Sequence, residues 1–142
     1  MTAKNTALKA LDAFNRHDAA AFAALYASDA VAYDPMYPEP IRGQEAIRRD
    51  AEAFFRAFPD VRCHLLGDVL EGSDRLAFQL RMTGTNQGPI AMPQGEQPPT
   101  GRKVETELAI FCQLGQDGLI RSEHRYFDMV AILAQLGLLP MP

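Results

Sequence analysis

IRSEHRYFDMVAILAQLGLL, residues 120–139, is the segment around which the predicted elements of this chain are arranged. Up to Phe127 the residues follow the alternation of a β-strand, and from Met129 onward the apolar residues are grouped as in a short helix. Asp128 stands at the junction, where its carboxylate can accept the open amide N–H groups of a helix start. The stretch therefore predicts a strand that runs into a short apolar helix, with Asp128 as a helix cap, a catalytic carboxylate, or both.

Alternation divides the predicted strand into two faces. One face combines an apolar anchor with hydroxyls, an imidazole and a carboxylate, namely Ile120, Ser122, His124, Tyr126 and Asp128. The opposite face carries Arg121, Glu123, Arg125 and Phe127. A purely structural strand would seldom direct four polar side chains at its interior, because unpaired buried polar groups are costly. We therefore expect the face with His124 and Asp128 to line a functional site.

Length and composition indicate one soluble domain, residues 1–142, with a core of its own. The net charge of −4 is spread along the chain without basic clusters, which disfavours nucleic acid as a partner. No apolar run approaches the roughly 20 residues that cross a bilayer, and the first ten residues lack a signal peptide's apolar centre. We therefore expect a cytoplasmic protein with no membrane partner. Cys63 and Cys112 fit no metal-binding pattern, which favours reduced, buried thiols.

Three helices are predicted first, and the remainder is mostly strand. Apolar residues at helical spacing predict helices over residues 7–14, 19–27 and 44–58. Alternation predicts strands over residues 31–35, 61–70, 75–83 and 104–112. The Gly- and Pro-rich residues 85–101 are interpreted as a long loop without structure of its own, which in a compact domain is usually functional or mobile. The order predicts an α+β protein with helices packed on one face of a curved sheet.

Several short motifs follow one another along nearly the whole chain. NRHD lies at the end of the first predicted helix, IRGQEAI precedes the third helix and AFPD follows it. The later motifs are TGTNQG, PPTGRKVE, YFD and QLGLL. In this order and spacing the chain resembles the SnoaL-like polyketide (ester) cyclases of the nuclear-transport-factor-2-like superfamily. The resemblance implies a cone: a strongly curved, mostly antiparallel sheet wraps around three N-terminal helices and a short C-terminal helix and encloses an apolar pocket. It also implies a homodimer formed through the sheet.

The resemblance further implies general acid/base chemistry without a metal or cofactor. In such cyclases a carboxylate before the last helix serves as acid and base in an intramolecular aldol condensation, and Asp128 matches it. The base must be close, oriented and partly desolvated, and the developing enolate oxygen needs hydrogen-bond donors. The candidate donors are His124, Asn86, Gln87 and Tyr126, with His124 also a candidate catalyst. The substrate we expect is a hydrophobic carbonyl compound such as a polyketide ester.

Asp34 is a second candidate base. YDPMYPEPIRGQEAI, residues 33–47, is similar in spacing to the stretch around the base of ketosteroid isomerases, which shuttles a proton between carbons of an enone. Asp34 falls on that base, but the first helix contains no Tyr, so the isomerases' oxyanion hole is not evident. Asp34 is thus either a proton shuttle or the start of a Pro-rich turn.

Tyr33 and His64 complete the candidates for the pocket wall. A third hypothesis is a non-catalytic module for small-molecule binding or dimerisation, in which Asp34 and Asp128 are both structural. A hydrolase that holds water between carboxylates and an Arg, as in the superfamily's epoxide hydrolases, has no distinct motif here. Whether Asp34 and Asp128 share one cavity matters most, because two nearby carboxylates would form an acid/base pair.

Overall fold

The computed structural model describes residues 2–139, in which six strands form one sheet. Across the sheet the strands follow the order β2 (Ile41–Arg42), β1 (Tyr26–Tyr33), β8 (Ile120–Phe127), β7 (Lys103–Leu114), β4 (Arg75–Thr85) and β3 (Arg62–Glu71). Neighbouring strands are antiparallel, except that β1 and β8 run parallel. The predicted α+β class with a mostly antiparallel sheet is confirmed.

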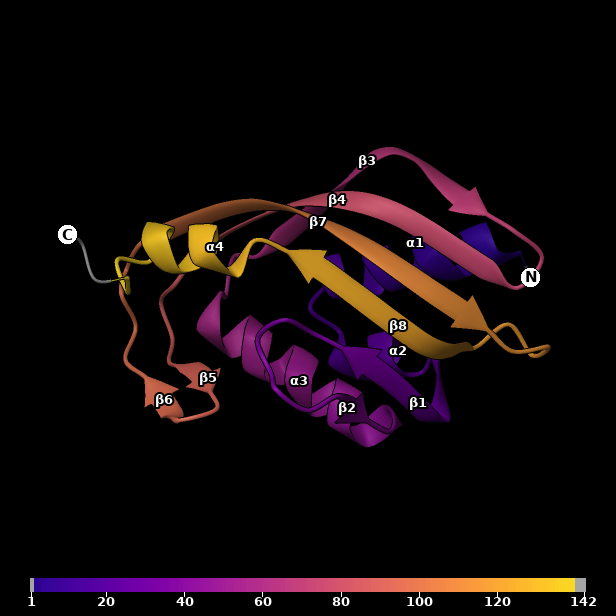
Figure 1. Cartoon of the computed structure of the whole chain (residues 1–142), viewed down its shortest axis with the longest axis horizontal. Helices are drawn as coiled ribbons and strands as arrows, with labels where there is room; N and C mark the ends of the chain where they lie inside the picture. The colour runs from indigo at the N-terminus through magenta and orange to yellow at the C-terminus, as the bar shows by residue number, and fades with distance from the viewer. Residues whose placement is uncertain (1, 140–142) are drawn as a thin grey trace.

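Three helices lie on one face of the sheet, which bends over them (Figure 1): α1 (Ala3–Asn15), α2 (Ala19–Ala23) and α3 (Gln44–Ala57). A fourth helix, α4 (Met129–Gln135), follows β8 and lies at the end of the molecule opposite the N-terminus (Figure 1). No helix within residues 2–139 combines the length and apolarity that a membrane crossing requires. The predicted three N-terminal helices and short C-terminal helix are confirmed.

Each helix begins where the sequence offers a cap or a turn. Thr2 and Asp18 accept the amide N–H groups of Asn5 and Ala21, which satisfies donors that a helix start leaves open. Helix α3 begins after Gly43 and buries Ile47 on its inner side, in keeping with the apolar stripe in its sequence.

The sheet owes its curvature to irregular pairing at three places. The register shifts between Tyr26 and Val31 in β1, between Leu66 and Leu70 in β3, and between β7 and β8 at Leu114. An extra residue on one strand bends that strand and increases its twist. These bulges let the sheet wrap around the helices and leave space between the two layers.

The bulge in β8 reverses the predicted orientation of this strand. Leu114 pairs with Ile120 and Gln113 pairs with Ser122, so Arg121 is an extra residue in β8. Beyond it the alternation is inverted, because a shift of one residue moves every side chain to the other face. Glu123, only 5% exposed, therefore faces the interior together with Arg125 and Phe127.

The prediction that Ser122, His124 and Tyr126 point inward is wrong. These side chains lie on the outer face of the sheet, where Tyr126 is 55% exposed. The alternation in the sequence correctly separated the two faces of the strand, but it did not indicate which face is turned toward the helices.

Two local predictions also need correction. Helix α2 ends at Ala23, earlier than the alanine-rich sequence predicts, because Tyr26 already enters β1 and pairs with Ile120 of β8. The long loop over residues 85–101 has structure of its own, since β5 (Ile90–Met92) and β6 (Gly95–Gln97) form an antiparallel hairpin. In α2, the tertiary pairing of Tyr26 overrides the local helix propensity.

Candidate active site

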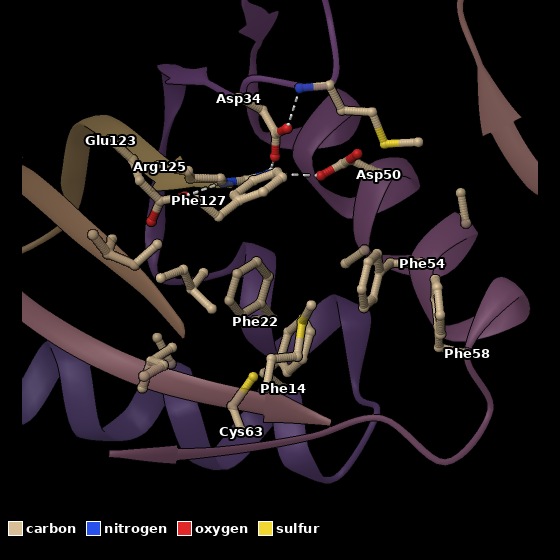
Figure 2. Close-up of a pocket in the computed structure, with 18 of the residues that line it drawn as sticks. Phe14, Phe22, Asp34, Asp50, Phe54, Phe58, Cys63, Glu123, Arg125 and Phe127 are labelled. Carbon is tan, nitrogen blue, oxygen red and sulfur yellow. Dashed lines mark hydrogen bonds and ion pairs between the residues drawn. The ribbon is translucent and has the colours of Figure 1, made fainter. Parts of the chain in front are cut away.

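A cavity of about 190 Å³ lies between the sheet and the helices. Most of its wall is apolar and includes the aromatic rings of Phe14, Phe22, Phe54, Phe58 and Phe127 (Figure 2). Hairpin strand β5 and helix α4 also contribute side chains to the wall. A dry apolar cavity of about 150 Å³ is enough to hold a benzene ring. This cavity can therefore receive at least one ring of an apolar molecule.

Four charged side chains meet at one end of this apolar cavity (Figure 2). Arg125 Nη1 donates to Asp34 Oδ2 at 3.0 Å and to Asp50 Oδ2 at 2.9 Å. Arg125 Nε donates to Glu123 Oε2 at 2.7 Å. One guanidinium thus binds three carboxylates that come from three separate parts of the chain, and we call these four residues the charged cluster.

The two aspartates are held by their own local structure. Asp34 follows β1, and its Oδ1 accepts the amide N–H of Met36 at 2.8 Å in the turn that begins there. Asp50 lies on α3, and its Oδ1 accepts the Tyr37 hydroxyl at 3.0 Å. Tyr37 belongs to the same turn as Asp34, so this turn fixes both carboxylates around Arg125.

Glu123 is held from the opposite side of the charged cluster. The Tyr26 hydroxyl, on a residue that is 1% exposed, donates to Glu123 Oε1 at 2.6 Å. Cys112 Sγ lies 3.6 Å from the same oxygen. Tyr26 is in β1 and Cys112 in β7, the two strands that flank β8. Three neighbouring strands thus hold one buried, hydrogen-bonded carboxylate.

The charged cluster changes the pKa values of the groups around it. Burial by itself would lower the pKa of Arg125, but attraction to the carboxylates of Glu123, Asp50 and Asp34 outweighs it and raises the pKa well above its ordinary value. Burial and then the Glu123 carboxylate raise the pKa of Tyr26 well above its ordinary value. Arg125 therefore stays charged and Tyr26 stays a neutral hydrogen-bond donor at neutral pH.

Tyr37 and Cys112 report the same negative potential. Burial and then Asp50 raise the pKa of the Tyr37 phenol, and burial and then Glu123 raise the pKa of the Cys112 thiol. Three carboxyl groups share one guanidinium, so the charged cluster has more acidic groups than basic ones. Within residues 2–139, no group of three or more His, Cys, Asp or Glu side chains is arranged to hold a metal ion.

Of the two candidate bases, the structure brings only Asp34 to the cavity. Asp34 lines the wall next to the charged cluster. Asp128 is exposed, does not line the cavity, and accepts the amide N–H of Ala131 at 3.0 Å as the N-cap of α4. Asp34 and Asp128 thus form no acid/base pair.

The predicted donors His124 and Tyr126 lie on the outer face of the sheet. The His124 ring stacks on Tyr33 with the ring centroids 4.4 Å apart, and Tyr126 meets Phe111 edge to face at 5.7 Å. Tyr33 is therefore also outside the cavity. His64 is exposed on β3 and does not line the cavity either. None of these four predicted residues contributes to the wall.

Asn86 and Gln87 also lie away from the cavity wall. Asn86 is fully buried, and its amide donates to the carbonyl oxygens of Ala57 and Gly88 and accepts from the amide and hydroxyl of Thr100. All its hydrogen-bonding capacity is used to fasten the base of the β5–β6 hairpin to the end of α3. Gln87 is exposed. The structure gives Asn86 a structural role instead of contact with a substrate.

Sequence reasoning missed Asp50, Glu123 and Arg125. Asp50 stands three residues after Ile47 and four before Phe54, which both belong to the apolar stripe of α3. That spacing was a usable signal. Glu123 and Arg125 alternate with Phe127, but only the bulge decides that this face is buried.

Comparison with solved structures supports the fold. The chain is similar to AclR from Streptomyces galilaeus, with a TM-score of 0.80 and 24% identity over 99% of this chain and 83% of AclR. It is similar to a Catenulispora acidiphila protein with a ketosteroid isomerase-like fold, solved with trimethylamine, at a TM-score of 0.77 and 17% identity over 96% and 97% of the two chains. The chain is also similar to SalBIII, an epoxide hydrolase/cyclase-like enzyme in pyran ring formation in the polyether salinomycin. The TM-score is 0.73, with 20% identity over 91% of this chain and 92% of SalBIII.

No curated protein sequence matches the chain closely enough to count as a relative. The fold that these solved structures share is the one predicted from the order of the sequence motifs. A family model for the SnoaL-like polyketide cyclases matches residues 5–136, which is nearly the whole chain, so the protein belongs to this family of cyclase-type enzymes.

Proposed function

We propose that the protein catalyses cofactor-free proton transfer on a hydrophobic carbonyl compound, with Asp34 as the general base. The observation that supports this proposal is the charged cluster at one end of an otherwise apolar cavity. An apolar cavity selects a hydrophobic substrate, and a few convergent polar groups orient its reactive end. A polyketide ester is the substrate class that family membership favours.

The reaction begins with a proton α to the substrate's carbonyl group. The Asp34 carboxylate accepts this proton, and the electron pair of the C–H bond moves to the carbonyl oxygen to form an enolate. In a cyclisation, the enolate carbon attacks a second carbonyl carbon of the same molecule, and the resulting alkoxide takes the proton back from Asp34. In an isomerisation, the proton returns to a different carbon. Both reactions leave the enzyme unchanged and need no co-reactant.

The bond between Arg125 Nη1 and both aspartates favours a second candidate reaction, the opening of an epoxide. One carboxylate would accept a proton from a substrate hydroxyl or a water molecule, whose oxygen attacks an epoxide carbon. The bond between that carbon and the epoxide oxygen breaks, and a protonated carboxyl donates its proton to the epoxide oxygen. The 3.0 Å and 2.9 Å contacts to Asp34 and Asp50 hold two carboxyl groups close enough for this division of roles. Asp34 and Asp50 would then be needed equally.

Exchange of α-protons in deuterium oxide tests the proposal without knowledge of the natural substrate. 2-Tetralone is a suitable probe, since it is a neutral, apolar ketone with acidic α-protons, and its exchange can be followed by NMR. We expect wild-type protein to accelerate exchange and Asp34→Asn to lose on the order of 10²–10⁴-fold of that rate. Asp128→Asn, which retains a good helix cap, should exchange like wild type.

Three outcomes would redirect the proposal. Loss of exchange in Asp128→Asn with full retention in Asp34→Asn would restore the base predicted from the sequence. Loss in Asp50→Asn alone would move the base to α3. A wild-type protein without any exchange activity, but with slow opening of a hydrophobic epoxide, would favour the epoxide reaction.

We also propose that the protein forms a homodimer through the outer face of the sheet. Phe111 and Tyr126, which are 51% and 55% exposed, lie on this face beside His124 and Tyr33. Contiguous exposed aromatic side chains of this kind favour a protein interface. Sedimentation of Phe111→Ser against wild type tests the dimer, which the variant should weaken.

A further inference from the structure

Almost every donor of the charged cluster is already used within the protein. Tyr26 donates to Glu123, and Tyr37 donates to Asp50. Arg125 uses Nε for Glu123 and Nη1 for the two aspartates. Its third nitrogen, Nη2, donates to no group within the part of the chain that the structure describes. Among the described residues, every fully buried side-chain nitrogen or oxygen has a hydrogen-bond partner. Because Nη2 has no partner, it is not fully buried. Arg125 itself lines the cavity, so Nη2 is the donor that remains for a ligand.

We propose that Arg125 Nη2 donates the hydrogen bond that holds the substrate's carbonyl oxygen, and that Tyr26 and Glu123 are positioning residues that direct Nη2 toward the cavity. This inference rests on the proposed proton transfer and identifies the group that stabilises its enolate. When Asp34 removes the α-proton, negative charge develops on the carbonyl oxygen. Arg125 then strengthens its hydrogen bond to that oxygen and keeps its own proton throughout.

The positioning argument follows from the planarity of the guanidinium group. Its nitrogens lie in one plane, so fixing Nε and Nη1 fixes the direction of Nη2. The 2.7 Å bond from Nε to Glu123 and the paired bonds from Nη1 to Asp34 and Asp50 do this. Glu123 can act as an anchor only if its carboxylate cannot rotate, and the 2.6 Å bond from Tyr26 prevents that rotation.

The arrangement also restricts the charge of the ligand. The two free N–H groups of Nη2, placed among three carboxyl groups, suit a neutral acceptor such as a ketone, ester or aldehyde oxygen. A ligand with its own carboxylate would place a fourth acidic group beside Asp34, Asp50 and Glu123. We therefore expect the cavity to bind acetophenone more tightly than benzoate, although the two molecules are similar in size.

NMR of the guanidinium groups tests the position of Nη2 directly. When rotation about the Cζ–Nε bond of Arg125 is slow, Nη1 and Nη2 give separate signals, and we expect this in the free wild-type protein. Tyr26→Phe should merge them, whereas Tyr33→Phe, a matched change on the outer face of the sheet, should not. On addition of 2-tetralone, we expect the Nη2 protons to shift while the Nε proton does not. Shifts of the cavity methyl groups of Leu11 and Ile132 without any response of Nη2 would overturn the inference, and so would absence of all these shifts.

Exchange rates test whether this hydrogen bond matters in the reaction. Arg125→Lys keeps the charge but loses the planar fork, and should lower kcat for 2-tetralone exchange on the order of 10²-fold. Tyr26→Phe should lower kcat on the order of tenfold and leave KM unchanged, because the contact gains strength only as the enolate forms. Arg121→Lys, on the same strand but on its outer side, is the control that should keep the wild-type rate. Tyr26→Phe decides the question if Arg125→Lys does not fold.

The outcomes separate this inference from the proposed function. Normal exchange in both Arg125→Lys and Tyr26→Phe, with loss in Asp34→Asn, would overturn the role of Arg125 and leave the proposed base in place. A wild-type protein that binds 2-tetralone through Nη2 without exchanging its protons would overturn the proposed function and leave the binding site in place. A Tyr26→Phe variant that loses thermal stability but keeps both kcat and separate guanidinium signals would show that Tyr26 is only structural.

Discussion

Replacement of Arg125 by Met should destabilise the protein strongly at neutral pH. The side chains of Asp34, Asp50 and Glu123 are 11%, 18% and 6% exposed, so Arg125→Met leaves three poorly solvated carboxylates without their shared partner. Removal of one partner from a buried ion pair costs about 3–5 kcal/mol, because the remaining charge is uncompensated. We expect a decrease of that size in the free energy of unfolding.

Urea unfolding followed by far-ultraviolet circular dichroism measures this change, because the chain contains no Trp for a fluorescence signal. In a chain of 142 residues, 1 kcal/mol corresponds to roughly 4 °C, so the melting temperature should fall by about 12–20 °C. Arg121→Met is the matched control. Its ion pairs with Asp117 and Asp29 are exposed, and their loss should cost less than about 1 kcal/mol.

The comparison of Arg125→Met with Arg121→Met decides the prediction. A difference below about 1 kcal/mol between Arg125→Met and the wild-type protein at neutral pH, or equal losses in the two variants, would refute the description of the charged cluster as buried and held together by Arg125.

Other predictions concern the thiols, the base of the hairpin and its close contacts. Burial raises the pKa of Cys63 to about 12, so alkylation should stay slow at pH 8.5 until urea unfolds the chain. The free energy of unfolding should decline as the pH rises from about 8.5 toward 12, because in this range only the thiol of the unfolded chain ionises. Fast alkylation of the folded protein would contradict this burial. Asn86→Ala should lower the free energy of unfolding by about 2–4 kcal/mol, since it leaves buried partners unsatisfied; a urea curve like wild type would contradict the structural role of Asn86. Gly88→Ala should cost about 3 kcal/mol, because the new methyl group would lie 2.0 Å from the carbonyl oxygen of Arg56. In the control Gly72→Ala, the added methyl group would lie 3.9 Å from its nearest neighbour, and stability should change by less than about 0.5 kcal/mol. Equal losses of stability in the two variants would count against the close approach of Gly88 to Arg56.

Local sequence patterns were sufficient to predict most of the elements. The apolar stripe of α3 and the alternation in β4 and β7 are repeated over enough residues to identify these elements. The same patterns failed where contacts with distant residues decide the outcome. Helix α2 is cut short because Tyr26 pairs with β8. The β5–β6 hairpin pairs locally, but Asn86, which lies outside both of its strands, fastens its base to Ala57 at the end of α3.

The candidate site could be predicted only in part, and Asp34 is the predicted residue that lines the cavity. Its motif, Asp-Pro before a Pro-rich turn, is local and visible in sequence. Asp128 was also correctly described as a helix cap, but its predicted neighbours in the pocket were wrong, because they depended on which face of β8 is buried. One bulged residue, Arg121, decided that question, and nothing in the local pattern marks it.

Motifs and periodicities are enough to identify the family, the order of helices and strands, and the curved sheet over three helices, because each of these signals occupies a short stretch of the chain. Which acidic groups share the cavity depends on how distant parts of the chain pack together. Asp34, Asp50 and Glu123 come from a turn, a helix and a central strand, and they meet around Arg125 only after the bulge in β8 and the parallel pairing of β1 with β8 are in place. The physical reason is that a change of register by one residue exchanges the two faces of a strand, whereas it leaves the strand's own hydrophobic pattern unaltered.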